Sequence, residues 1–363
     1  MAAVTDPTDD LSALWAWFAD EHCPGDSPLY ERICGAVSAD RELLEFVRQA
    51  PSGAHMPLTL LAAVHYLILD GLDHPLADVY AGRSDADPAP LFLDLCRTHR
   101  PELAALLAVR LVQTNDCGRS AAIGPGLTWL SSRLDEPFGL VDVGASAGIN
   151  LLCDRYRIDY GDHGTTGPAG SPVEIACRVV AGEPPIADRL PAIGSRIGID
   201  RAPIDLTDPD DARWLLACVW PDSDRLERTA ASIGLARDDP PLVIPGNAVD
   251  TLPGVLADLP EAQSAVVVTT AAAGYFSIEQ RRRFLSVLEA GSTDRSVAWL
   301  SAETGGVVEA LADAAAPDHD LPDCDVLGAL TFEGGKGTAH LLGFVHRHGA
   351  WMDWRGPPAT PHR

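Results

Sequence analysis

Apolar residues recur at helical spacing through the first third of the chain. Leu11, Leu14, Trp15 and Phe18 fall on one face of a helix, because their spacing follows the 3.6-residue period. Further helices are expected over residues 38–50, 56–71, 91–113 and 120–134. No strand-like alternation interrupts this pattern. The sequence therefore predicts a helical N-terminal domain over residues 1–134, which would cap the domain that follows.

The pattern changes at Asp135-Glu136-Pro137, where short apolar runs begin to alternate with helical segments. Strands are expected over residues 138–144, 195–200, 242–248, 264–273 and 296–303, with helices over 208–234 and 278–291. Two late runs, at 326–334 and 339–349, flank a glycine-rich turn and predict an antiparallel hairpin. Strands alternating with helices indicate an α/β fold. We expect a doubly wound, Rossmann-like domain over 135–363, with an inserted hairpin near 157–190.

The amino-acid composition limits the classes of binding partner that the chain is expected to have. The net charge of −25 opposes nucleic acids and anionic membranes, apart from a local basic run at residues 281–283. The longest apolar run, residues 56–69, is 14 residues long and short for a membrane span. None of the eight cysteines has C-x-x-C spacing, and the N-terminus begins acidic. These features predict a cytoplasmic protein with reduced thiols.

The stretch from Gly144 to Gly148 reads GASAG and fits two kinds of site. As G-x-S-x-G it would present Ser146 as the nucleophile of a hydrolase. The required order of acid before histidine can be met by Asp320, Asp323 or Asp325 ahead of His340 or His346. That fold, however, has several strands before its nucleophile, and the upstream region here is helical.

The second interpretation is a glycine-rich turn between a strand and a helix, facing a cofactor. Asp142 would order the loop or contact the amino group of a methionine, while Gly144, Ala145, Ser146 and Gly148 would form the turn. At the ends of the next two strands, Asp200 would bind a ribose diol, and Asn247 and Ala248 would lie beside the base. S-adenosylmethionine is favoured over NAD because Ser146 replaces the second glycine of G-x-G-x-x-G.

Four stretches of the chain resemble the bacterial DUF2332 family. They cover residues 113–127, 140–161, 196–208 and 219–228. The family resembles class I S-adenosylmethionine-dependent methyltransferases in its central region, so the resemblance implies the same fold and cofactor. It also implies departures from that pattern: Ser146 replaces the central glycine of G-x-G-x-G, and Asn247 stands where methyltransferases often carry Asp. Thr269-Thr270 stand where a His-Ser pair is expected in relatives.

Three further residues are candidates for the site. Asn115 and Arg119 lie in a polar block and would either form a lid over the cofactor or hold an inter-helix turn by side-chain hydrogen bonds. Tyr275, after the fourth strand, would either orient or deprotonate a methyl acceptor or pack as a buried aromatic. His346 and His348 leave a third ligand unnamed, so no metal site is expected.

Together these observations predict an S-adenosylmethionine-dependent methyltransferase acting on a small molecule. The first alternative is a serine hydrolase that uses Ser146. The second is a non-catalytic cofactor-binding or interaction module, which the residues at Thr269, Thr270 and Asn247 keep open. The methyl acceptor, the oligomeric state and any partner protein are not predicted by the sequence.

Overall fold

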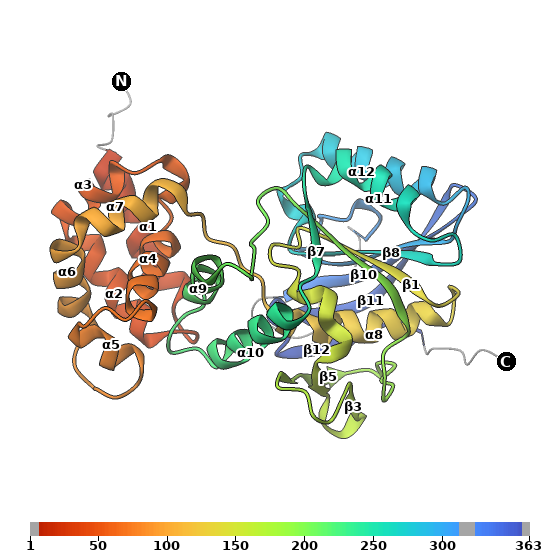
Figure 1. Cartoon of the computed structure of the whole chain (residues 1–363), viewed down its shortest axis with the longest axis horizontal. Coiled ribbons are helices and arrows are strands. Elements are labelled where there is room, and N and C mark those ends of the chain that lie inside the picture. Colours follow the sequence, from red (N-terminus) through yellow and green to blue (C-terminus); the bar gives the residue numbers. More distant parts are fainter. Residues whose placement is uncertain (1–6, 312–323, 358–363) are drawn as a thin grey trace. The chain divides into compact units, whose positions relative to one another are not determined.

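The computed structural model describes residues 7–311 and 324–357 (Figure 1). Contacts divide the chain into two compact units, each built from two stretches of sequence. Unit 1 comprises Met1–Thr114 and Thr207–Ala230, and unit 2 comprises Asn115–Leu206 and Ala231–Arg363. The sequence-based boundary at residue 135 had placed residues 115–134 with the N-terminal helices. They group with unit 2 because the helix they form packs against a strand of its sheet.

Unit 1 is helical. Its elements are α1 (Pro7–Trp17), η1 (Phe18–His22), α2 (Pro28–Ala39), α3 (Arg41–Arg48), η2 (Ser52–Ala54), α4 (Pro57–Leu69), α5 (Pro75–Tyr80), α6 (Pro88–Thr98), α7 (Arg100–Val109) and α9 (Pro209–Ala217). Ser38, the first residue of the helix predicted over 38–50, instead lies in the last turn of α2. Asp40 caps α3, because its backbone is extended and its side chain accepts a hydrogen bond from the Leu43 N–H.

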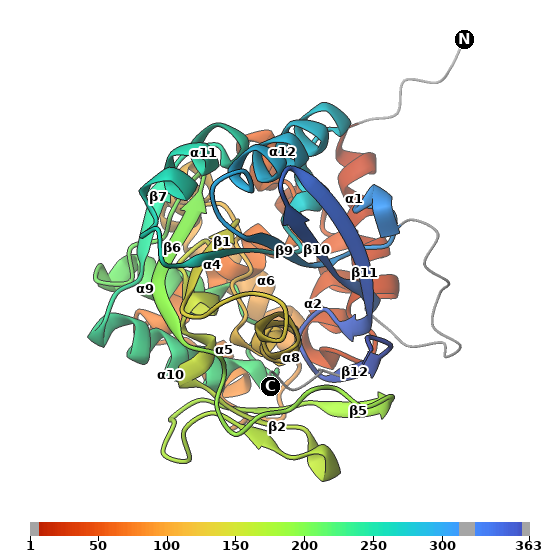
Figure 2. The same ribbon diagram turned by 90° about the vertical axis from the view of Figure 1, so that its right-hand side faces the viewer.

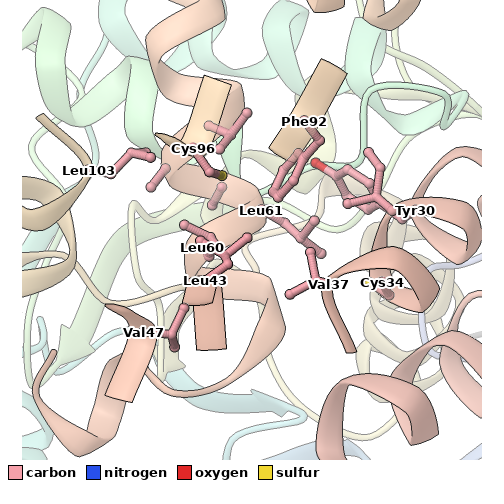
Figure 3. Packing of buried hydrophobic residues seen from close by; sticks show 14 of the residues in the cluster. Tyr30, Cys34, Val37, Leu43, Val47, Leu60, Leu61, Phe92, Cys96 and Leu103 are labelled. Carbon is pink, nitrogen blue, oxygen red and sulfur yellow. The ribbon is translucent and has the colours of Figure 1, made fainter. Parts of the chain in front are cut away.

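The core of unit 1 is formed where its helices converge. Figure 3 shows Tyr30 of α2, Leu61 of α4 and Phe92 of α6 among these buried side chains. The apolar run of α4 is buried over most of its length, which explains why it lacks a polar face. The excess of apolar residues at 56–69 therefore belongs to a buried helix. In the part of the chain that the structure describes, no helix is long and apolar enough to cross a membrane.

A later segment of the chain completes this core. Trp214 of α9 is buried among the N-terminal helices, and its indole N–H donates to the Leu111 carbonyl at 2.9 Å. The Ser27 hydroxyl donates to Asp222 at 2.6 Å. These contacts explain why residues 207–230, which follow a strand of unit 2 in sequence, fold with unit 1.

Unit 2 is built on a nine-stranded, mostly parallel sheet, which confirms the expected α/β class. The strand order is β5-β12-β11-β10-β9-β8-β1-β6-β7. These strands are β1 (Phe138–Val143), β5 (Arg178–Ala181), β6 (Ile193–Asp200), β7 (Leu242–Pro245), β8 (Ser264–Thr270), β9 (Val297–Glu303), β10 (Cys324–Glu333), β11 (Lys336–His346) and β12 (Trp351–Trp354). The five adjacent strands β7, β6, β1, β8 and β9 are mutually parallel, whereas β10 is antiparallel to both β9 and β11.

Helices cover both faces of this sheet. Figure 2 shows α11 (Ala248–Asp258) and α12 (Ile278–Gly291) on one side of the strands and α8 (Ser120–Ser131) on the other. The central strands β1, β8 and β9 are consequently buried at every residue. This double coverage explains their nearly continuous apolar runs.

The remaining elements of unit 2 are short. A small sheet has the order β3-β2-β4, formed by β2 (Arg157–Asp159), β3 (Thr165–Thr166) and β4 (Glu174–Ala176). The 3-10 turns are η3 (Cys117–Arg119), η4 (Ile149–Arg155), η5 (Gly161–His163), η6 (Ala273–Tyr275) and η7 (Glu309–Leu311), and α10 (Arg225–Asp238) begins in unit 1 and ends in unit 2. The region expected to hold an inserted hairpin thus supplies the small sheet and β5.

Replacing Trp214 with Ala tests the contribution of the later segment to unit 1. The variant loses a fully packed indole and leaves a cavity, so we expect a loss of about 3 to 5 kcal/mol in the free energy of unfolding. Chemical denaturation followed by far-ultraviolet circular dichroism measures it. Trp17→Ala is the matched control, because the Trp17 side chain is 47% exposed. Equal losses in the two variants would contradict a core role for α9.

Candidate functional site

The candidate site lies at the carboxyl ends of β1 and β8 in unit 2. After β1 the chain builds β6 and β7 on one side, and it then returns to build β8 and β9 on the other side. The loops that leave β1 and β8 therefore run in opposite directions, which opens a crevice where parallel α/β sheets bind ligands. Asp142, Ser146, Arg119 and Thr270 all belong to this edge of the sheet.

The glycine turn after β1 is closed by acceptors from its own unit. The Gly144 N–H donates to the Ile199 carbonyl at 2.8 Å. The Ser146 N–H donates to Asp200 Oδ2 at 2.8 Å. Asn115 Oδ1 accepts from the N–H groups of Ala147 and Ile149, at 3.1 and 3.2 Å. These donors, expected to face a cofactor, are thus used to hold the turn.

Backbone conformation explains the residue types of this turn. Gly144 has a φ of +80°, and a Cβ placed there would lie 2.6 Å from the Ala272 Cβ. Gly148 has a φ of +76°, and a Cβ there would lie 2.7 Å from Pro241. Ser146 adopts a φ of +53° without being glycine, which is uncommon and concentrates at functional sites. The two glycines are therefore required by close packing as well as by φ.

The residues expected to hold the ribose and the base also support the fold. The Asp200 carboxylate accepts from the Ser146 N–H and, through Oδ1, from the Ala202 N–H at 2.8 Å. These bonds use two of the roughly four acceptor positions of a carboxylate. Asn247 is the N-cap of α11 and accepts from the Val249 N–H at 3.0 Å, and Ala248 is the first, buried residue of that helix.

Asp142 is a buried carboxyl group at the end of β1. Burial and the neighbouring Asp200 raise its pKa and the Arg119 guanidinium opposes the shift, so that the resulting pKa is about 7. Among the described residues, neither Asp142 Oδ2 nor the buried Ser146 hydroxyl has a hydrogen-bond partner. Such groups are costly unless a partner or a ligand satisfies them. The edge of the sheet thus presents two unsatisfied polar atoms beside the glycine turn.

Arg119 links this turn to the end of β8. The side chain is buried at the start of α8, and its Nη1 donates to the Thr270 carbonyl at 2.9 Å. Arg119 also lines a small hollow together with Ala122, Thr270, Ala271, Ala302, Asp325, Val345, His346 and Arg347. Asp325, at the start of β10, is buried, and this burial raises its pKa, while Arg347 and Arg119 oppose the shift.

Glu303 at the end of β9 organises the loop that follows β8. Its carboxylate accepts from the N–H groups of Ala272 and Ala273, both at 3.0 Å, and of Gly274 at 3.2 Å. Burial raises the pKa of Glu303, while these donors oppose the shift. Tyr275 follows directly and is 90% exposed, so its ring is not a packed core aromatic.

Glu303 and Arg347 were missed as site residues in the sequence, and Asp325 was considered only as a triad acid. Glu303 ends a buried strand with a carboxylate, the same signal that identified Asp200. Asp325 and Arg347 become neighbours only through the pairing of β10 with β11. Of the proposed triad acids, Asp320 and Asp323 lie outside the described residues.

The crowding at Gly144 is testable by substitution. Gly144→Ala combines a left-handed backbone, costing about 1 to 2 kcal/mol, with a steric overlap costing about 1 to 3 kcal/mol more. Gly161→Ala is the matched control, since Gly161 has a φ of +63° with nothing within 4 Å of the added Cβ. Thermal unfolding should show a larger loss for Gly144→Ala. Equal losses would show that the turn tolerates a side chain toward Ala272.

The buried Asp142 predicts a pH dependence of stability. Its carboxyl keeps its proton up to about pH 7 in the folded protein, against an ordinary value of 3.8 in the unfolded chain. Between these values the folded state binds more protons, so stability falls as pH rises, by up to about 1.4 kcal/mol per unit. Asp142→Asn removes this pH-dependent loss. The free energy of unfolding of the variant should therefore increase relative to that of the wild type as pH rises.

Urea unfolding of both proteins at several pH values between these limits measures the effect. The exposed Asp294→Asn is the control, and its difference from the wild type should not follow the same trend. A constant difference between Asp142→Asn and the wild type would contradict the raised pKa.

Comparison with known proteins assigns the chain to a family. No curated protein and no solved structure matches it. A profile of the family described as "Uncharacterized protein conserved in bacteria (DUF2332)" matches residues 12–354, which include both units and the whole candidate site. The resemblance found in the sequence is thereby confirmed, and the chain belongs to the DUF2332 family.

Proposed function

We propose that the chain is a cytoplasmic S-adenosylmethionine-dependent methyltransferase that acts on a small molecule. The observation that carries this proposal is the position of the glycine turn. It follows β1 at the point where the strand order reverses, and Asp142 and Asp200 end the two neighbouring strands beside it. Dinucleotide- and nucleoside-type cofactors bind at this position in doubly wound sheets.

The side chains at the turn fit the methionine end of this cofactor. The unsatisfied Asp142 Oδ2 can accept from an ammonium group, and the Arg119 guanidinium can pair with a carboxylate. The Ser146 hydroxyl offers a further donor beside them. Asp200 retains acceptor positions for a ribose diol, because the backbone uses two of about four. Since the turn's own N–H groups are engaged, side chains would carry most of the recognition.

The bound cofactor would supply an electrophilic methyl group on a positively charged sulfur. The chain's own residues would contribute proximity and orientation, which account for most of the rate gain in such transfers. Tyr275 is exposed next to the loop that Glu303 holds, and its hydroxyl can orient an acceptor or take up its proton. Glu303 acts as a positioning residue, because it fixes the backbone before Tyr275.

Calorimetric titration with S-adenosylmethionine tests the proposal. We expect binding by the wild type, and a loss of at least about tenfold in affinity for Asp142→Asn, equivalent to about 1.4 kcal/mol. Gly144→Val should abolish binding because a side chain cannot fit beside Ala272, whereas Ser146→Ala should have a small effect. Each variant is first shown to be folded by circular dichroism.

No heat at millimolar cofactor, with folded wild-type protein, would refute the proposal. Binding without methyl transfer to any candidate acceptor would favour the cofactor-binding or interaction module.

A serine hydrolase remains the second candidate because of one observation. Ser146 has the positive φ that a nucleophile adopts on a strained strand-to-helix turn. Its hydroxyl, however, is buried and lacks a hydrogen-bond partner among the described residues, so no base is in contact with it. Labelling by a fluorophosphonate probe that Ser146→Ala abolishes would establish this alternative.

A further inference from the structure

The loop after β8 presents two large apolar side chains to solvent at the carboxyl edge of the sheet. Tyr275 is 90% exposed, and Ile278, the first residue of α12, is 67% exposed. The loop adjoins the glycine turn, since a Cβ on Gly144 would lie 2.6 Å from the Cβ of Ala272, three residues before Tyr275. An exposed apolar patch, formed by Tyr275 and Ile278, therefore lies next to the candidate site.

The backbone that carries this patch is held by side chains on both sides. The N–H groups of residues 272–274 donate to Glu303. Arg281 donates through Nε and Nη2 to the carbonyl groups of the last two of these residues, both at 3.2 Å. Ala271 enters the loop with a φ of +52°, a conformation that concentrates at functional sites. A ligand that binds Tyr275 thus avoids the cost of ordering a flexible loop.

The charge beside the patch is positive, although the chain as a whole carries −25. Arg281 and Arg282 follow Ile278 by three and four residues on α12, so the three side chains lie on one side of the helix. Neither arginine forms an ion pair with an acid among the described residues. Arg283, by contrast, pairs with Asp250 at 2.9 Å. The cations nearest the patch are therefore those that no acid of the chain neutralises.

We propose that this patch binds a small aromatic anion, with its ring on Tyr275 and Ile278 and its charge on Arg282. Aromatic rings gain from contact with one another beyond the area that they bury. Guanidinium donors match the planar oxygens of a carboxylate. Arg281 adds a second positive charge, and Glu279, the acid of the same turn, leaves the patch net positive. The identity of this anion as the methyl acceptor rests on the proposed function, whereas the binding site itself does not.

Saturation-transfer difference NMR of the full-length protein with benzoate tests the patch. Benzyl alcohol is the neutral aromatic control, and cyclohexanecarboxylate is the anion without an aromatic ring. We expect benzoate to bind with a dissociation constant in the millimolar range. Each control lacks one of the two interactions, so we expect each to bind at least about threefold more weakly.

Substitutions at Tyr275 separate its ring from its hydroxyl. Tyr275→Ala should weaken benzoate binding at least about fivefold, whereas Tyr275→Phe should keep the affinity within about twofold because the ring remains. Both variants should fold, since the side chain is exposed. Trp17→Ala removes an exposed aromatic ring from unit 1 and should leave the affinity unchanged.

Substitutions in the basic run test the position of the charge. Arg282→Gln should weaken benzoate binding at least about threefold, because it removes the cation on the side of Ile278. Arg283→Gln is the matched control: it removes the same charge from the next residue, but from a guanidinium that Asp250 already pairs. We expect it to leave the affinity within about twofold.

Three results would overturn the patch as a site for aromatic anions. They are the absence of saturation transfer to benzoate, equal affinity in Tyr275→Ala and wild type, and equal losses in Arg282→Gln and Arg283→Gln. Sedimentation velocity tests the other occupant, a second copy of the chain. A dimer that Tyr275→Ala dissociates would show that a second copy covers the patch, and would also overturn the proposal.

The outcomes also separate this site from the proposed function. Benzoate binding without S-adenosylmethionine binding would leave the patch standing and remove the methyltransferase proposal. S-adenosylmethionine binding without benzoate binding would do the reverse.

Discussion

The turn after β1 depends on two side chains that reach it from outside. Asn115 accepts from two of its N–H groups, and Asp200 accepts from a third. Asn115 begins unit 2, and Asp200 ends the neighbouring strand β6, so these bonds fasten three distant parts of the sequence at one point. A buried turn with a positive φ at Gly144, Ser146 and Gly148 has few local hydrogen bonds of its own. Without these acceptors, its donors would be left unsatisfied in the interior.

The same edge of the sheet carries three buried acidic side chains, and burying an acidic side chain lowers the stability of the folded state. Asp142, Glu303 and Asp325 each have a pKa raised by burial, which means that the fold disfavours their charged forms. The cost of burying the Glu303 carboxylate is offset by hydrogen bonds from three backbone N–H groups, so its burial has a structural explanation. Among the described residues, Asp142 Oδ2 has no hydrogen-bond donor. Unsatisfied acids of this kind concentrate at sites that bind or react.

The sequence was sufficient for the α/β class, the central strands and the glycine turn, because these follow from local period and from residues adjacent in the chain. The sequence was insufficient where tertiary contacts determine which unit a segment joins or which residues meet. Residues 207–230 have the pattern of a crossover helix, yet Trp214 is buried in unit 1, and no local signal distinguishes the two. Asn115 was recognised as part of a polar block. Its role in closing the turn depends on a contact more than thirty residues away.

Arg119 makes the two halves of the candidate site electrostatically dependent on each other. Its charge opposes the rise in the pKa of both Asp142, beside the glycine turn, and Asp325, in the hollow. A ligand carboxylate on Arg119 would neutralise part of that charge, so both acids would hold their protons more tightly. A cationic ligand at Asp142 would act in the opposite direction, favouring its ionised form. A cationic group beside Asp142 and an anionic group on Arg119 would therefore each compensate the charge that the other brings.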